Sequence, residues 1–349
     1  MKRVLLIKTS SMGDVIHTLP ALTDAAQAVP GIRFDWVVEA AFADIAARHP
    51  AVGKVIPCEL RRWRKHPLKA RASGEWQAFR EQVSAPGYDA VIDAQGLLKS
   101  AFVTRLAKPP RYGLDRASAR ESLSALALDH PLAVARGQHA VTRTRQLFAQ
   151  ALGYALPPDT PPDYGLPRPA PPRPLAQPAE LVFCHGTTWP TKHYPQAYWR
   201  ELAALACNAG HRVYLPWGNE AEQQRAQRIA HGMPQCEVLP PMTLAALTDA
   251  FLRWDGFIAV DTGLAHLAAA AGMTGVGLYG PTDPALTGVL GPRAHSLSAQ
   301  FPCAPCVQER CTYRGESGQG VEPPCFSNLP PERVWEALLS SRAEMGPAV

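Results

Sequence analysis

The sequence predicts an α/β protein built from two doubly wound parallel-sheet domains, and three observations support this prediction. The chain has 349 residues, whereas a single hydrophobic core stops growing at about 250–300 residues. Short apolar runs alternate with stretches of helical periodicity in both halves, which is typical of parallel sheets. Between the halves, proline occupies 10 of the 22 residues from 157 to 178, which favours a stiff linker.

The first domain, residues 1–160, opens with an apolar run at 4–8, a turn of small polar residues and a helical segment. Pro20 leaves two alternatives: the helix begins near Thr18, with Pro20 in its first turn, or the helix is kinked at Pro20. The remaining pattern predicts strands at 34–38, 54–57 and 90–93, with helices at 40–48 and 74–83.

The second domain, residues 179–330, follows the linker at 161–178. The pattern predicts strands at 181–184, 212–215, 237–239, 256–260 and 275–279, and helices at 198–209, 221–231 and 264–271. A last helix within residues 331–349 has the length to pack back on the first domain. Because ligands of open α/β sheets bind at the carboxyl ends of the strands, we expect the two domains to face a central crevice that holds the site.

The composition excludes several classes of function. Hydrophobic residues make up 46% of the chain and charged residues 19%, as in ordinary folded proteins. The net charge of +5 permits an anionic ligand. Nucleic-acid binding is not indicated, because the chain has no long basic stretch interleaved with aromatic residues. The apolar run after Lys2 and Arg3 is too short for a secretory signal, and no apolar stretch is long enough for a membrane span. We therefore expect a cytoplasmic protein.

The turn after the first predicted strand holds the first candidate site residues. Ser10, Ser11, Met12 and Gly13 are small or flexible, and the glycine allows a substrate to approach the backbone closely. Asp14 follows them. Its residue type and position favour a helix cap, and the alternative is a general base for a hydroxyl acceptor.

A second candidate site follows the first strand of the second domain. Thr187 and Thr188 come directly after a glycine, and Lys192 lies four residues further on. Hydroxyl groups, a glycine backbone and one ammonium group suit a diphosphate. An ordinary loop with a solvated lysine is the alternative.

A third candidate site follows the predicted strand at 256–260. Asp261, Thr262 and Gly263 open the next helix, which carries His266 in its first turn. Backbone N–H groups at a helix start suit phosphate, whereas Asp261 is better placed to accept a hydrogen bond from a sugar hydroxyl. The alternatives are a capping role for Asp261 and a buried structural role for His266.

A run of cations marks a fourth candidate. Five consecutive residues contain Trp63 and four cations, namely Arg61, Arg62, Arg64 and Lys65. Such a run is usually a solvated loop. The alternative is an anion-binding surface, because arginine side chains bind phosphates and carboxylates with two parallel hydrogen bonds.

Together these motifs resemble the lipopolysaccharide heptosyltransferase family, and within it the enzymes that add the first inner-core heptose. The segments that carry the resemblance are residues 8–15, 17–22, 34–39, 61–65, 93–97, 215–218 and 261–266. The resemblance implies a GT-B fold and inverting transfer of L-glycero-D-manno-heptose from ADP-heptose to lipid A carrying 3-deoxy-D-manno-octulosonic acid (Kdo-lipid A). It also implies no required cofactor or catalytic metal, and a peripheral position on the cytoplasmic face of the inner membrane.

The resemblance also implies roles for individual residues. Asp14 would be the catalytic base, and Lys192 would neutralise charge on the leaving ADP. Glu222 would hold the ribose, and Met242 would offer its backbone to adenine. The implied donor-binding set is Thr187, Thr188, Lys192, Glu222, Met242, Asp261, Thr262, Gly263 and His266. The implied acceptor-binding set is Ser10, Ser11, Met12, Gly13, Arg61, Arg62, Arg64, Lys65 and Arg120.

Four clustered cysteines, Cys303, Cys306, Cys311 and Cys325, leave three alternatives open: a structural zinc site, free thiols or a regulatory disulfide. A comparable cysteine-rich loop is familiar from the second heptosyltransferase of the family. An acceptor that already carries heptose is therefore an alternative to Kdo-lipid A. A sugar-nucleotide epimerase or hydrolase of the same fold, and a nucleotide-binding scaffold without catalysis, are further alternatives.

Overall fold

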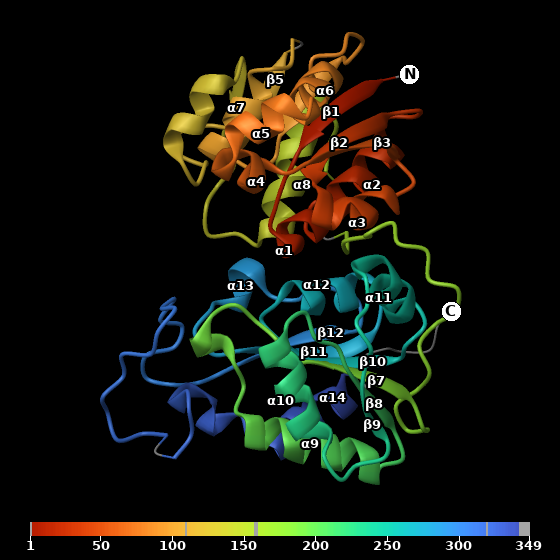
Figure 1. Ribbon diagram of the computed structural model, residues 1–349, viewed down its shortest axis with the longest axis vertical. Coiled ribbons are helices and arrows are strands. Elements are labelled where there is room, and N and C mark those ends of the chain that lie inside the picture. The colour runs from red at the N-terminus through yellow and green to blue at the C-terminus, as the bar shows by residue number, and fades with distance from the viewer. Residues whose placement is uncertain (1, 109, 157–159, 319, 342–349) are drawn as a thin grey trace. The chain divides into compact units, whose positions relative to one another are not determined.

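The computed structural model describes residues 2–108, 110–156, 160–318 and 320–341 (Figure 1). The chain divides into two compact units, Met1–Leu166 and Pro167–Val349. Each unit contains one six-stranded sheet in which all neighbouring strands are parallel. No helix among the described residues is long and apolar enough to cross a membrane.

The sheet of the first unit has the order β3-β2-β1-β4-β5-β6. Its strands are β1 (Arg3–Ile7), β2 (Arg33–Glu39), β3 (Val52–Cys58), β4 (Ala90–Asp93), β5 (Arg111–Leu114) and β6 (His130–Leu132). Its α-helices are α1 (Met12–Ile16), α2 (Leu19–Ala28), α3 (Ala43–Ala47), α4 (Leu60–Lys65), α5 (Pro67–Ala72), α6 (Glu75–Val83), α7 (Leu98–Thr104) and α8 (Ala140–Leu152). A 3-10 helix, η2 (Ser122–Ala127), packs on α7.

The sheet of the second unit has the order β12-β11-β10-β7-β8-β9. Its strands are β7 (Glu180–Cys184), β8 (Arg212–Leu215), β9 (Cys236–Val238), β10 (Gly256–Val260), β11 (Thr274–Tyr279) and β12 (Ala294–Ser298). Its α-helices are α9 (Gln196–Asn208), α10 (Glu220–Ala230), α11 (Leu244–Phe251), α12 (Gly263–Ala270), α13 (Pro284–Thr287) and α14 (Pro331–Ser340).

Both sheets have the same strand order when each is counted from its own first strand: 3-2-1-4-5-6. This is the order of a doubly wound sheet, in which the winding reverses between the first and fourth strands. The prediction of two doubly wound parallel-sheet domains is confirmed. The reversal points lie between β1 and β4 in the first unit and between β7 and β10 in the second.

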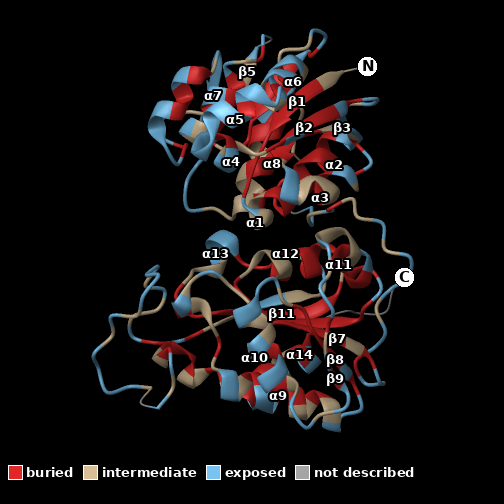
Figure 2. Ribbon diagram, viewed as in Figure 1, coloured by how far each residue is buried: buried red, intermediate tan, exposed pale blue. Residues whose placement is uncertain are grey.

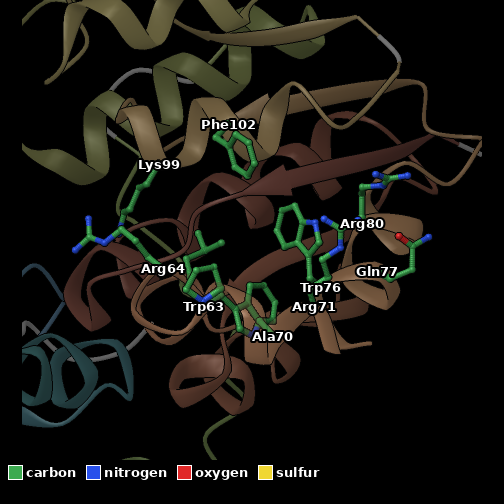
Figure 3. Close-up of a pocket in the computed structure, with 11 residues that line it drawn as sticks. Trp63, Arg64, Ala70, Arg71, Trp76, Gln77, Arg80, Lys99 and Phe102 are labelled. Atoms are coloured by element: carbon green, nitrogen blue, oxygen red, sulfur yellow. The ribbon is translucent and has the colours of Figure 1, made fainter. Parts of the chain in front are cut away.

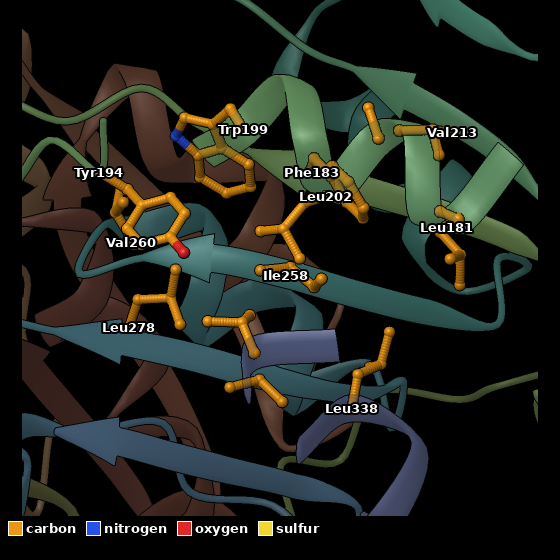
Figure 4. Close-up of a cluster of buried hydrophobic side chains, with 14 of the residues drawn as sticks. Leu181, Phe183, Tyr194, Trp199, Leu202, Val213, Ile258, Val260, Leu278 and Leu338 are labelled. Carbon is orange, nitrogen blue, oxygen red and sulfur yellow. The ribbon is translucent and has the colours of Figure 1, made fainter. Parts of the chain in front are cut away.

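The cores explain why the apolar runs form strands. Strands with both faces covered by helices read as continuous apolar runs, and β4, β10 and β11 are buried along their whole length. Figure 2 shows most of β1 and β2 in red, the colour of buried residues. In the second unit, Phe183 on β7 and Ile258 on β10 pack with Trp199 of α9 and Leu338 of α14 in one cluster (Figure 4).

The start of α2 agrees with the first of the two alternatives that the sequence leaves for Pro20. Thr18 is its N-cap residue, and Pro20 lies in the first turn, where the missing N–H has no helical partner to lose. Three strands were not predicted, namely β5, β6 and β12. Each contains exposed or half-buried positions and lacks a continuous apolar run, because each lies at or next to a sheet edge.

The last helix, α14, packs on α9 and β11 of its own unit, with Val334 and Leu338 in the core. Its amphipathic spacing explains both the helix and the burial. The expected return of this segment to the first domain stays a prediction. Residues 342–349 of the expected segment lie outside the described residues.

The two units divide within the proline-rich stretch. On its first-unit side, Tyr164 is buried, and Gly165 lies so close to His49 that a Cβ atom would be 2.5 Å from its Nε2. On its second-unit side, Arg168 donates to the carbonyl groups of Phe251 and Ala271 at 3.1 and 3.0 Å. Each half of the stretch is therefore fixed to its own unit by side-chain contacts.

Candidate active site

The reversal point of the first unit brings two turns together. Lys8, after β1, donates from Nζ to the carbonyl of Ala94, after β4, at 2.9 Å. Gln95 accepts from the backbone N–H groups of Thr9 and Ser10 at 2.9 and 3.2 Å and donates to the Ser10 carbonyl at 2.6 Å. The turn that leads to Asp14 is therefore held by the side chain of Gln95.

Asp14 lies on α1 with its two oxygens in different surroundings. Its Oδ2 accepts from the backbone N–H and the hydroxyl of Ser11 at 2.8 and 2.9 Å, which is a capping arrangement. Its Oδ1 lies 3.3 Å from Lys8 Nζ, and 42% of the side chain is exposed. Burial raises its pKa, but the Lys8 charge and the Ser11 hydrogen bonds outweigh burial and lower the pKa of Asp14 to about 2.

Lys99 is a neighbour of this turn that the sequence analysis missed. Its Nζ donates to the Ser10 hydroxyl at 2.6 Å, and burial together with the nearby Arg61 charge lowers its pKa. A single lysine early in a surface helix carries no sequence signal of its own. Gln95 appeared in the sequence analysis only as part of a motif, and its clamping role depends on a fold contact 86 residues away from Thr9.

The reversal point of the second unit carries the predicted phosphate residues. Thr187, after β7, donates from Oγ1 to the carbonyl of Asp261, after β10, at 3.0 Å. Lys192 Nζ lies 2.8 Å from Asp261 Oδ2, and Thr282 donates to the same oxygen at 2.7 Å. Lys192 also lies over the ring of Trp189, 4.5 Å from its centre. The structure thus brings Thr187, Lys192 and Asp261 together. Lys192 and Asp261 form an ion pair, and the hydrogen bond from Thr282 supports it.

The helix after Asp261 begins as the sequence predicts. Thr262 is the N-cap residue of α12 with an extended backbone, and Gly263 is its first residue. The backbone N–H groups of this helix start follow Asp261 in the chain, and the start of a helix carries partial positive charge. His266 lies in the first turn and is buried, whereas Thr188 is exposed.

Glu222, on α10, lies near the turn after β7 that contains Gly186 and Thr187. Asn219 caps that helix, and Glu222 Oε2 accepts from the Gly218 N–H at 2.7 Å. A Cβ atom on Gly186 would lie 2.6 Å from the Glu222 carboxyl carbon, so only glycine allows this approach. Glu222 therefore lies beside the Gly186–Thr187 turn. Met242 is half-buried in the segment after β9.

The cationic run forms helix α4, and its members differ in their partners. Trp63 is buried, and its Nε1 donates to Glu75 Oε2 at 2.9 Å. Arg62 pairs with both Glu59 and Glu75. Arg61, Arg64 and Lys65 are exposed, and Arg120 is exposed in the segment after β5. The structure therefore separates Arg62, which is neutralised within the fold, from the other predicted cations.

The clustered cysteines line one small cavity of about 20 Å³. All four are free thiols. In the part of the chain that the structure describes, no three His, Cys, Asp or Glu side chains form a group that could hold a metal ion. The four cysteines thus lie around one cavity, and a structural zinc site at this place stays a prediction.

The sequence of this chain is similar to those of known proteins. Residues 76–316 match the model of glycosyltransferase family 9 (heptosyltransferase). The chain is 52% identical over 340 residues to lipopolysaccharide heptosyltransferase 1 of Pseudomonas aeruginosa, covering 95% of this chain and 96% of that protein. It is 50% identical over 291 residues to the protein of the same name from Escherichia coli, covering 83% and 91%.

A solved structure shows the same likeness. The E. coli heptosyltransferase WaaC with ADP matches at a TM-score of 0.80 and 48% identity, covering 85% of this chain and 93% of that one. The same enzyme with ADP-2-deoxy-2-fluoro heptose matches at a TM-score of 0.76 and 47% identity, with the same coverage. The fold, the family model and relatives of half-identical sequence lead to one conclusion: this chain belongs to glycosyltransferase family 9, the heptosyltransferases.

Proposed function

We propose that the protein transfers L-glycero-D-manno-heptose from ADP-heptose to Kdo-lipid A in lipopolysaccharide inner-core biosynthesis, with inversion and without a metal ion. The observation that carries the proposal is the pair of reversal points, one with an ionised, partly exposed carboxylate and the other with a lysine beside a helix start. The half-identical relatives named heptosyltransferase 1, and the related structures with ADP and an ADP-heptose analogue, support this donor and acceptor.

In the proposed reaction, Asp14 is the base. Its Oδ1 takes the proton of an acceptor hydroxyl as the acceptor oxygen bonds to the anomeric carbon of heptose. A carboxylate with a pKa of about 2 is a weak base, so the transfer must come late, after the hydroxyl has become acidic. Ser10, Ser11, Met12 and Gly13 would shape the place of the acceptor sugar.

The bond between heptose and ADP breaks in the same step, and the electron pair leaves with ADP. Lys192, which is paired with Asp261, would turn to the diphosphate and neutralise the leaving group. Thr187, Thr188 and the N–H groups from Thr262 and Gly263 would bind the phosphates. In the same proposal Glu222 holds the ribose, Met242 contacts adenine, and His266 lines the sugar site.

The acceptor's anionic groups would be bound by Arg61, Arg64, Lys65 and Arg120, all of which are exposed. Arginine is suited to phosphates and carboxylates alike. Such an acceptor lies in a bilayer, so we place the protein peripherally on the cytoplasmic face of the inner membrane, where anionic lipids attract these cations.

The test is transfer by purified protein from ADP-heptose to deacylated Kdo-lipid A in the presence of EDTA, with the anomeric configuration of the product determined by NMR. We expect a single heptose in inverted configuration at an undiminished rate. ADP release without a glycosylated product would favour the hydrolase alternative. Transfer only to an acceptor that already carries heptose would assign the protein to a later step of core assembly.

A further inference from the structure

The first unit contains a cavity of about 730 Å³ bounded by α4, α5, α6 and α7 (Figure 3). This volume lies within the range of about 300–1,000 Å³ that is usual for ligand sites. Its apolar lining includes Trp63, Ala70, Trp76 and Phe102. No step of the proposed reaction uses these four side chains, so the cavity needs its own explanation.

The aromatic wall remains open on one side. Phe102 stacks on Trp76 with ring centres 5.7 Å apart and an angle of 19° between the planes. Trp76 in turn packs against Trp63 and Phe79, both of which are buried. Phe102 nevertheless keeps 56% of its surface exposed. Exposed apolar surface next to a formed cavity is a mark of a binding site.

Further exposed apolar side chains lie on the elements that bound the cavity or pack against them. Leu98, one helical turn before Phe102, is 51% exposed, and Leu68, next to the lining residue Pro67, is 83% exposed. Leu123 and Leu126 on η2, which packs against α7, are also exposed. Exposed apolar side chains are therefore frequent in this part of the first unit.

The charges at the cavity are positive. Arg64, Arg71, Arg80 and Lys99 contribute to its lining. Two carboxylates of this region, Glu75 and Glu59, pair with Arg62. A third, Glu39, acts on Lys99. Among the described residues, none of these three carboxylates forms an ion pair with Arg64, Arg71 or Arg80, so these cations of the lining remain available for an anionic ligand.

We propose that this cavity binds one fatty-acyl chain of the anionic lipid acceptor, while the cations of its lining bind the acidic headgroup. An apolar interior with cations around it complements an alkyl chain that ends in an acidic group. Lys99 connects the cavity with the reaction, because it lines the cavity and donates to Ser10 in the turn that leads to Asp14. This inference rests on the proposed function for the identity of the lipid.

The first experiment measures binding without any transfer reaction. The full chain is titrated with n-alkyl phosphates of six to ten carbons below their micellar concentrations, and affinity is followed by calorimetry. We expect the dissociation constant to fall about fourfold with each added methylene until the cavity is full. We expect n-alkyl trimethylammonium ions of equal length to bind at least tenfold more weakly. Affinity that does not depend on chain length would overturn the proposal.

A variant then locates the site. Phe102→Asp places a charge in the wall at an exposed position, so the fold is expected to persist. Leu339→Asp, at an exposed position on α14, is the matched control. Phe102→Asp should abolish the chain-length dependence, and Leu339→Asp should preserve it. Loss in both variants, or in neither, would contradict the assignment. If Phe102→Asp does not fold, the chain-length series on the unaltered protein still decides.

A second experiment connects the cavity with catalysis. The ratio of kcat/KM for acylated over deacylated acceptor is compared between the unaltered protein and Phe102→Asp. We expect this ratio to fall at least tenfold in the variant, and an unchanged ratio would contradict the proposal. Failure of transfer to both acceptors would refute the proposed function. The dependence of alkyl-phosphate affinity on chain length would then still test the cavity proposal. Transfer to both acceptors with chain-independent alkyl binding would refute the cavity proposal alone.

Discussion

The two reversal points have the same architecture and opposite chemistry. In each, the turn after the first strand of the unit is bonded to the turn after the fourth, by Gln95 in the first unit and by Thr187 in the second. In the first, the carboxylate of Asp14 is 42% exposed and the ammonium of Lys8 is buried. In the second, the carboxylate of Asp261 is only 10% exposed.

The comparison shows that the strand order determines where each reversal point lies, whereas the side chains at that point determine its charge. Lys8 holds Asp14 in the ionised form from the buried side, so that a carboxylate faces solvent. In the second unit, Asp261 forms an ion pair with Lys192 and accepts a hydrogen bond from Thr282. One doubly wound frame thus presents an ionised carboxylate, and the other presents a cation beside a helix start.

Replacing Asp14 should produce the largest effect, because general bases contribute about 10²–10⁴-fold to rate. In Asp14→Asn we expect kcat to fall by that factor while KM for ADP-heptose stays within about twofold, since donor groups lie in the other unit. Steady-state measurement of ADP release coupled to product analysis would show this. A kcat within threefold of the unaltered protein would remove Asp14 from the mechanism.

Lys192 should be the second most sensitive position. Removing one preorganised protein group that stabilises the charge of a leaving group lowers the rate by about 10²–10³-fold. In Lys192→Met we expect kcat/KM for ADP-heptose to fall by that factor, and in Lys192→Arg we expect part of the activity to return. If Lys192→Met instead lowered only thermal stability, the ion pair with Asp261 would be structural and the contrast between the two reversal points would disappear.

The sequence predicts the two doubly wound sheets better than it predicts the side-chain hydrogen bonds and ion pairs within each unit. Buried strands such as β4 and β10 are visible as apolar runs, and the start of α2 follows from Thr18 and Pro20. Edge strands such as β6 carry too little apolar patterning to be recognised.

Among site residues, types that bring their own chemistry, such as Asp14 and Lys192, are identifiable because they follow strands. Gln95 and Lys99 are not, because their importance comes from partners more than 80 residues away. The pairing of Arg62 with Glu59 and Glu75 is likewise invisible in a run of cations, since it depends on how α4 and α6 pack.

A matched pair of substitutions compares the two cross-connections. Gln95→Ala leaves the backbone N–H groups of Thr9 and Ser10 without their acceptor, a loss of about 1–3 kcal/mol per buried group. Thr187→Val removes one donor to a carbonyl that can accept from water. We therefore expect Gln95→Ala to lower the melting temperature and kcat together, and Thr187→Val to affect mainly KM for ADP-heptose. Equal losses of stability would show that the two connections are equivalent.

The pH dependence of stability tests the electrostatics at Asp14. Its pKa in the folded protein, about 2, is lower than the ordinary aspartate value of about 3.9. The carboxylate therefore stabilises the fold fully above pH of about 4, and this contribution is lost as pH falls toward 2. Melting temperatures should decline less steeply over that range in Asp14→Asn than in the unaltered protein. Parallel declines would mean that Lys8 does not hold Asp14 in the ionised form.

The smallest expected effect separates neighbouring arginines of the first unit. Arg62 is bound to Glu59 and Glu75, so Arg62→Gln should leave KM for the acceptor within about threefold and lower the melting temperature slightly, as for an exposed ion pair. Arg64 is exposed and lines the cavity, so Arg64→Gln should raise KM for the acceptor about tenfold, the loss of one charge-assisted hydrogen bond. The measurement is acceptor KM at two salt concentrations, because an electrostatic contact of Arg64 must weaken as salt rises. If Arg62→Gln raised KM as much as Arg64→Gln, the ion pairs of Arg62 would have to open for the acceptor, and α4 would act as one cationic surface after all.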